Sequence, residues 1–236
     1  MKKIIKLAIV DFKLIFRDPS LRIFLVLPVI LFALIVWAIP ALVERYDFLI
    51  PYLPLILAVA VIENTQMFSF ISTMVLIDEK ETEVAKNYAV VPLSKAGYIV
   101  SRFLIPYLFT VLLNVVLFVV QPFFDIPLLS NLMLSFVTAL VVPAYALGIN
   151  SIVKNRMQGM VYVKAFNMIV LIPVAAFFIP GKLKHIFGIF PTHWIFQSIE
   201  NVCNSISSAL SLIIGTLFLA TLIWILSKSF IRKHFV

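Results

Sequence analysis

The sequence predicts an all-α integral membrane protein with six transmembrane helices, preceded by an amphipathic interfacial helix, and with both termini in the cytoplasm. Of its 236 residues, 63% are hydrophobic and only 13% are charged, whereas a soluble domain is about 45–50% apolar and about 25% charged. The apolar residues also form runs longer than about 18 residues, the length a helix needs to cross a bilayer. Together these observations exclude a soluble globular protein.

The first 20 residues are expected to form an amphipathic helix that lies in the membrane interface. Its cations fall within an arc of about 100° on a helical projection, and apolar side chains fill the opposite side. The Asp18-Pro19 pair ends the helix, because the residue before a proline disfavours the helical conformation. The residues alone are compatible with a simple membrane anchor. The interfacial residues singled out are Lys6, Phe12, Lys13, Arg17 and Asp18.

Six apolar segments follow, and they form a predicted transmembrane domain over residues 21–227 with a cytoplasmic tail at 228–236. The spans are expected at Leu21–Val43, Leu49–Ile77, Ile99–Gln121, Leu128–Val153, Gly159–Pro180 and Ile206–Ser227. The longest remaining stretches are residues 1–20, 78–98 and 181–205. None reaches the roughly 50 residues of an independent domain. A large catalytic or energy-converting domain is therefore expected on another chain.

The net charge of +8 predicts orientation rather than binding to nucleic acid. With a cytoplasmic N-terminus, sixteen of the nineteen Lys and Arg residues lie inside, and only Arg45, Lys182 and Lys184 lie outside. This bias follows the positive-inside rule, so both termini are expected in the cytoplasm. No nucleic-acid partner is predicted.

The second span carries a polar stripe around an acidic residue. Glu63 lies halfway along the span, where an unpaired carboxylate costs several kcal/mol. It shares an arc of about 120° with Gln66, Ser69 and Thr73. One interpretation is a lining for a substrate path or a subunit interface. The other is a protonated or hydrogen-bonded Glu63 that holds helices together, with Asn114 on the third span as a partner.

The cytoplasmic loop after the second span, residues 78–98, is predicted to contain a short amphipathic helix. Its acidic beginning suits a helix N-terminus, Val84, Tyr88 and Val91 follow at helical spacing, and Pro92 marks the end. It is either a solvated surface helix or a docking element for a cytoplasmic partner. On the other side of the membrane, Gly181, Gly188 and Pro191 interrupt residues 181–205, which predicts interfacial or re-entrant half-helices in an outer segment.

The sequence lacks the common signatures of catalysis. It contains no G-x-x-x-x-G-K-[ST] phosphate loop, no H-E-x-x-H or paired-cysteine metal motif, and no G-x-S-x-G nucleophile turn. We therefore predict a transport subunit rather than an enzyme, with no metal site and no catalytic residues.

Several segments together resemble the ABC-2 family of ATP-binding-cassette transporter permeases. The resemblance covers nearly the whole chain and is carried by Phe16-Arg17-Asp18-Pro19, Glu79-Lys80-Glu81, Pro92-Leu93-Ser94-Lys95, Ile172-Pro173, Phe178-Ile179-Pro180 and Phe190-Pro191-Thr192-His193-Trp194. Ser101-Arg102 occupies the place of a Gly-Lys pair in the family, and Glu83-Val84 replaces a Gly-Thr pair. These departures concern close backbone approaches near the loop, so the resemblance implies the fold but not the contacts with an ATPase.

The resemblance implies that the loop is a coupling helix that docks on a separate ATP-binding subunit, and that residues 1–20 form a connecting helix. The residues implied in coupling are Glu79, Glu81, Val84, Tyr88, Pro92 and Arg102. Two ATPase subunits would bind the ATP and Mg²⁺, so this chain would bind no cofactor. It would pair with a second permease copy or a related permease and be surrounded by lipids of the bacterial inner membrane. The path, lined by the second and fifth spans, would carry a lipid, drug or glycoconjugate. A secondary transporter or a membrane scaffold not driven by ATP is the alternative.

Overall fold

The computed structural model describes residues 19–82 and 95–234, and every regular element in these two ranges is a helix. The predicted interfacial helix, with Lys6, Phe12, Lys13, Arg17 and Asp18, lies outside the described residues. So do Val84, Tyr88 and Pro92 of the cytoplasmic loop. What can be followed in three dimensions is therefore the transmembrane bundle and the two flanks of that loop.

Six segments are long and apolar enough to cross a membrane, which confirms the six-helix prediction. The first span comprises α2 (Pro19–Ala33), a π-helical turn (Leu34–Ala38) and α3 (Ile39–Arg45); the second a 3₁₀ turn (Asp47–Tyr52) and α4 (Leu53–Glu81); the third α6 (Lys95–Val120); the fourth α7 (Leu128–Ala139) and α8 (Val141–Asn150); the fifth α9 (Arg156–Leu171) and a 3₁₀ segment (Ile172–Phe178); and the sixth α11 (Ala209–His234). The orientation of the termini stays a prediction.

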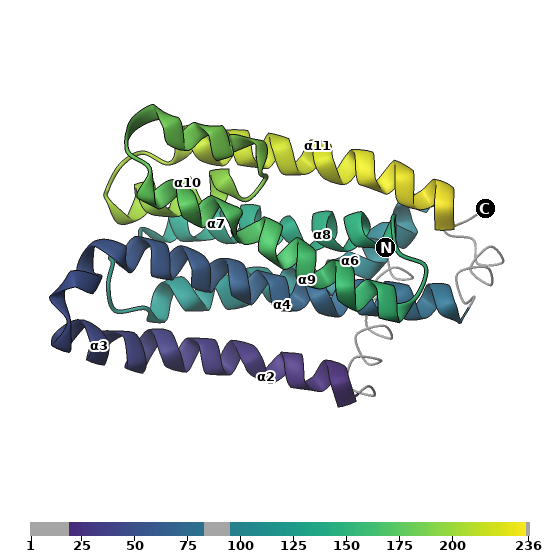
Figure 1. Cartoon of the computed structure of the whole chain (residues 1–236), viewed down its shortest axis with the longest axis horizontal. Helices are drawn as coiled ribbons and strands as arrows, with labels where there is room; N and C mark the ends of the chain where they lie inside the picture. The colour runs from purple at the N-terminus through teal and green to yellow at the C-terminus, as the bar shows by residue number, and fades with distance from the viewer. Residues whose placement is uncertain (1–18, 83–94, 235–236) are drawn as a thin grey trace.

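The second span is the centre of the bundle. Its α4 packs against α2, α6, α8, α9 and α10, and side chains along its length, among them Leu57, Ile71 and Ile77, are fully buried. By contrast, only 11% of the residues in the most apolar 18-residue stretch of the first span are buried. Figure 1 shows the long helices side by side, with α2 at one edge of the bundle and α11 at the other. A displacement of α4 would therefore require most of the other spans to move or repack.

Proline residues account for the interruptions within spans. Pro28 lies inside α2, and Pro40 follows the π-helical turn in the first span. Pro173 is the second residue of the 3₁₀ segment that ends the fifth span. Because proline has no backbone N–H to donate and clashes with the preceding turn, each of these positions is a place where regular α-helix is costly.

The outer segment folds back along the bundle. A 3₁₀ segment (Gly181–Ile189) leads to α10 (His193–Cys203), which packs against α4, α7 and α11. Ser198 donates a hydrogen bond to Ser211 of α11 at 2.8 Å, and Trp194 lies against Gly215 of the same helix. Gly215 is six residues from the outer end of α11, so α10 begins roughly 9 Å inside that end, at 1.5 Å per residue. The segment thus lies beside α11 rather than beyond its end, and its position in the membrane stays a prediction.

The beginning of α10 is tightly packed. Thr192 donates a hydrogen bond to the carbonyl of Val170 at 2.8 Å, and His193 is buried between the rings of His185 and Trp194. Burial, followed by the nearby His185 and Lys184, lowers the pKa of His193 to about 4. His193 is therefore neutral at physiological pH, which suits its apolar surroundings.

Candidate functional site

Four consecutive charged residues, 78–81, end α4 and point to different neighbours. Successive side chains on a helix are rotated by about 100°, so a run of four surrounds the helix axis. Asp78 and Glu81 face the beginning of α9, Glu79 faces α6, and Lys80 faces the end of α8. This end of α4 therefore joins three other spans through polar contacts.

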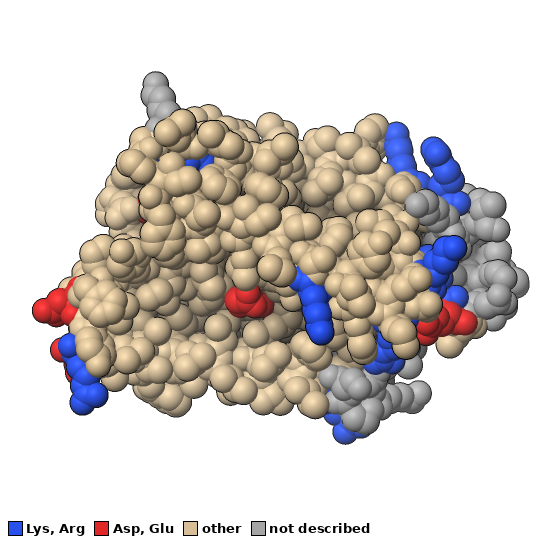
Figure 2. All heavy atoms as spheres, in the orientation of Figure 1, with Lys and Arg blue, Asp and Glu red and all other residues tan. Residues whose placement is uncertain are grey.

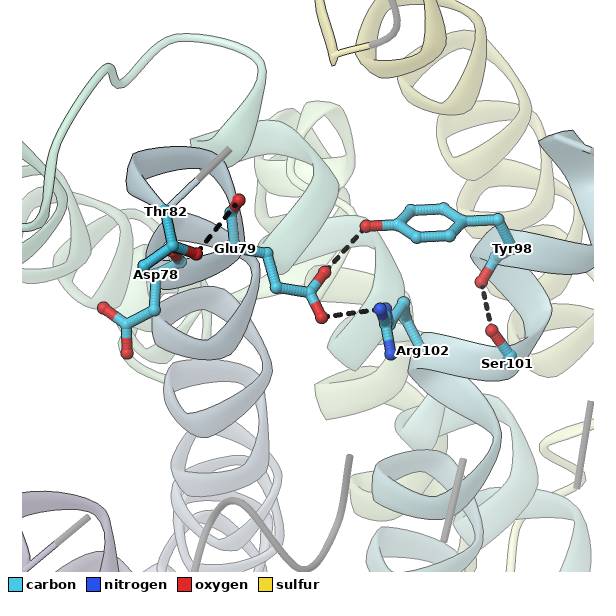
Figure 3. Close-up of polar contacts among 6 residues, drawn as sticks. All are labelled: Asp78, Glu79, Thr82, Tyr98, Ser101 and Arg102. Carbon is cyan, nitrogen blue, oxygen red and sulfur yellow. Dashed lines mark hydrogen bonds and ion pairs between the residues drawn. The ribbon is translucent and has the colours of Figure 1, made fainter. Parts of the chain in front are cut away.

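The strongest of these contacts is a buried ion pair between α4 and α6 (Figure 3). Arg102 Nη2 lies 2.6 Å from Glu79 Oε1, and Tyr98 donates its hydroxyl to Glu79 Oε2 at 2.7 Å. The exposed fractions are 7% for Glu79, 5% for Arg102 and 3% for Tyr98. The Arg102 guanidinium also lies 4.9 Å from the centroid of the Tyr98 ring, a favourable cation–π position. Both oxygens of the carboxylate are thus satisfied away from water.

The contacts with α9 and α8 use the helix ends. The backbone N–H of Arg156, the first residue of α9, donates to Glu81 Oε1 at 2.7 Å, and Arg156 Nη1 lies 3.4 Å from Asp78 Oδ1. Lys80 Nζ donates to the carbonyl of Val153, just after α8, at 2.7 Å. Carboxylates near a helix N-terminus and a cation near a C-terminus both complement the helix dipole.

The structure thus brings two of the predicted coupling residues together instead of placing them on the surface. Glu79 and Arg102 are buried against each other, and Glu81 is occupied by the N-terminus of α9. Tyr98 was missed by sequence reasoning. The signal was present: Tyr98 and Arg102 are four residues apart and so share one face of α6, which implies a common partner.

The polar stripe of the second span faces the interior of the chain. Ser69 and Thr73 are fully buried, and their hydroxyls donate to the carbonyls of Thr65 and Ser69, one turn earlier in the same helix. Gln66 is also buried and donates to Glu63 at 3.4 Å. Only Glu63 is partly exposed. Of the four predicted lining residues, Glu63 alone is available to a molecule outside this chain.

Asn114 holds α4 to α6, but its partners differ from the expected Glu63. Asn64 Nδ2 donates to Asn114 Oδ1 at 2.7 Å, and Asn114 Nδ2 donates to Thr65 Oγ1 at 3.1 Å. Among the described hydrogen bonds, none joins Asn114 to Glu63. One residue along a helix corresponds to a rotation of about 100°, so Asn64 faces α6 while Glu63 points to a different side.

A second polar group lies where α8 meets α9. Tyr145 donates to the carbonyl of Val163 at 3.0 Å and also contacts the Asn167 side chain, and it lies within electrostatic reach of Glu63. Lys164 is the neighbour of Val163 on α9, and its side chain is exposed. Figure 2 shows charged side chains gathered at the two ends of the molecule, with only isolated red and blue patches in the broad apolar region between them.

The comparisons with known proteins agree with this architecture. A family model described as "Fluoroquinolones export permease protein Rv2686c-like" matches residues 11–227, which is most of the chain. No curated protein and no solved structure matches the chain. The matched family consists of membrane export permeases, which are transport subunits rather than enzymes and have ABC ATPases as their general class of partner. The chain belongs to the Rv2686c-like fluoroquinolone export permease family, an ABC-2 type permease family.

Proposed function

We propose that this chain is the permease subunit of an ABC-type exporter in the bacterial inner membrane, driven by ATP hydrolysis on a separate ATPase. Membership of an export permease family supports the direction of transport. The sequence has no phosphate-binding loop of its own, so the nucleotide and its Mg²⁺ belong to the partner. The proposed assembly contains two ATPase subunits and two permease chains, either two copies of this chain or one with a related permease.

The observation that carries the proposal is the polar network at the two flanks of the cytoplasmic loop. Helix α4 ends at residue 81 and α6 begins at residue 95, so the loop is bounded by the two helices that Glu79, Arg102 and Tyr98 join. Lys80 and Glu81 add α8 and α9 to the same unit. A displacement of the loop by an ATPase would therefore be transmitted to the second through fifth spans together.

This geometry divides the predicted coupling residues into two roles. Glu79 and Arg102 act as positioning residues, since they are buried within the chain and hold the flanks in place. Val84, Tyr88 and Pro92, which lie in the loop between those flanks, are proposed to contact the ATPase. A conservative change in the first group should spare ATPase binding and impair coupling, whereas a change in the second group should weaken binding itself.

The proposed cargo is an amphipathic aromatic drug, for which the family description names the fluoroquinolones. The proposed path lies where two permease chains meet and is lined by the second and fifth spans. Glu63 supports this placement, because a partly exposed carboxylate within a span has to face protein or water rather than lipid.

The test is reconstitution of transport with the ATPase that copurifies with the tagged chain. Inverted inner-membrane vesicles containing both proteins are expected to accumulate a fluoroquinolone only with hydrolysable ATP. Tyr88→Ala should reduce ATPase copurification, whereas Glu79→Gln and Lys80→Gln should retain copurification and reduce transport per ATP hydrolysed. Glu44→Gln, an exposed glutamate in α3, is the matched control.

Two results would contradict the proposal. Accumulation without ATP that collapses on addition of an uncoupler would identify a secondary transporter. Failure of every ATPase to copurify, with transport unaffected by the loop variants, would favour a scaffold or another energy source. Thermal melting of each variant in detergent separates loss of coupling from loss of folding.

A further inference from the structure

One face of α9 is exposed along its whole length and combines methionine with a single cation. Relative to Lys164, the residues Met157, Met160, Val161 and Met168 all fall within an arc of about 100°, and all are exposed. Met157 is 81% exposed and Met168 is 73% exposed. The opposite side of α9, with Gly159, Val163 and Val170, is buried against the rest of the bundle. We call the exposed set the Met/Lys face.

Lys164 lies within the helical segment that forms the fifth candidate span. That segment runs from Arg156 to Phe178, so Lys164 is eight residues, or about 12 Å, from its first residue at 1.5 Å per residue. Charged side chains within a span face the bundle interior or a water-filled cavity, because exposure to hydrocarbon costs several kcal/mol. The described residues offer Lys164 no ion pair or hydrogen bond. The centre of the Met/Lys face therefore favours a polar occupant over lipid.

Glu63 supplies the opposite charge on the neighbouring helix. A Cβ added to Gly159 of α9 would overlap the Ile77 side chain of α4, which fixes the register of these antiparallel helices. Counted in the same direction along the bundle, Lys164 lies five residues from Gly159 on α9, and Glu63 lies fourteen residues from Ile77 on α4. The Cα positions of the two residues are therefore about 13 Å apart along the bundle axis. Among the described contacts no ion pair joins their side chains, so each remains available to a ligand.

We propose that Lys164 and Glu63 recognise the two charged ends of a zwitterionic aromatic substrate, with the methionines of the Met/Lys face supporting its ring system. The proposal rests on the proposed export function and specifies its binding site. Lys164 would bind a carboxylate, and Glu63 would bind a protonated amine. Fluoroquinolones carry these groups at opposite ends of a planar fused ring, and the unbranched, polarisable methionine side chain adapts to flat aromatic surfaces.

The test measures binding without ATP, so that it stands apart from the test of ATP-driven export. The full chain is placed in lipid nanodiscs large enough for two copies, and binding is followed by the fluorescence polarisation of three probes. Norfloxacin is the zwitterion, its methyl ester lacks the carboxylate, and its N-acetyl derivative lacks the basic amine. Wild-type protein is expected to bind the zwitterion most tightly.

The variants should separate the two charges. Lys164→Met should weaken binding of norfloxacin and the N-acetyl derivative about tenfold, which is 1.4 kcal/mol, and leave the methyl ester unchanged. Glu63→Gln should weaken norfloxacin and the methyl ester by a similar factor and leave the N-acetyl derivative unchanged. Lys164→Arg should retain binding, because it keeps the charge. Lys154→Met, an exposed lysine between α8 and α9, is the control and should change none of the three affinities.

Three outcomes would overturn the proposal. Wild-type protein that binds none of the probes would exclude this substrate class at the site, while leaving ATP-driven export of another cargo intact. Equal weakening of all three probes by Lys164→Met would indicate a structural effect. No change in any affinity with either variant would show that Lys164 extends to the membrane interface and Glu63 serves the chain alone.

Discussion

The charged residues of α4 and α9 fall into two regions, one in which the charges are paired within the chain and one in which they are not. At the C-terminal end of α4, each of residues 78–81 binds a group on another span, and the Glu79–Arg102 pair is almost wholly buried. Within the spans, Glu63 and Lys164 are partly or fully exposed, and neither has an opposite charge beside it among the described residues. The first region uses its charges to hold helices together. The second leaves its charges available, which is what a binding surface requires.

The comparison predicts a ranking of effects on stability, and the largest effect belongs to the buried pair. Arg102→Met should lower the free energy of unfolding by about 3–5 kcal/mol, because it leaves the Glu79 carboxylate buried without its cation. The double variant Glu79→Leu/Arg102→Met should recover much of this loss, since it removes the uncompensated charge. Unfolding in mixed detergent micelles measures both. A single variant as stable as wild type would show that the pair does not hold the flanks of the loop.

A smaller effect is expected for the neutral bonds between α4 and α6. Asn114→Leu removes the hydrogen bonds to Asn64 and Thr65 and should cost about 0.6–2 kcal/mol, the range measured for hydrogen bonds between membrane helices. Thr221→Leu provides the control, because Thr221 is exposed and bonds only within its own helix. Equal costs for the two variants would contradict a specific role for the Asn64–Asn114 contact.

The partly exposed pair at the same end should matter less. Asp78 and Arg156 side chains retain 36% and 32% of their exposure, so water and salt screen their attraction. Asp78→Asn is expected to cost less than about 1 kcal/mol, and the difference from wild type should shrink between 50 mM and 500 mM salt. A loss as large as that of Arg102→Met, independent of salt, would place Asp78 with the buried pair.

The smallest effect on stability is expected where the functional effect is greatest. Lys164→Met should change the free energy of unfolding by less than about 0.5 kcal/mol, as is usual for an exposed side chain without partners, although it removes the proposed carboxylate-binding group. The unfolding assay used for Arg102→Met applies here unchanged. Destabilisation of 2 kcal/mol or more would show that Lys164 has a structural role. It would also contradict the distinction between charges that stabilise the fold and charges available for binding.

Sequence reasoning identified the spans because long apolar runs are the strongest signal a membrane protein carries. It also selected Glu79 and Arg102, but it could not pair them, since 23 residues and an undescribed loop separate them along the chain. A charge-rich helix end is ordinarily solvated. The four-residue spacing of Tyr98 and Arg102 implies a common partner, but it does not identify that partner as Glu79.

The residues within the spans show how strongly a prediction of helix contacts depends on the exact position of each residue along its helix. Asn64 rather than Glu63 faces Asn114, because a shift of one residue turns a side chain by about 100°. Lys164 is one of the sixteen cations predicted to lie inside, because the fifth span was expected to begin at Gly159. The helix begins three residues earlier, at Arg156, so Lys164 lies more than two turns from its start.

The inward-folded α10 also bears on how an exporter can move cargo without letting ions leak across the membrane. His193, Phe196 and Ile199 of this helix are buried among the outer ends of the spans, and His193 is uncharged at neutral pH. Close packing at this end of the bundle leaves little room for water within one chain. In the two-chain assembly proposed above, α10 would therefore act as a barrier inside each chain, and a cargo would cross between the chains while the ion gradients of the membrane are preserved.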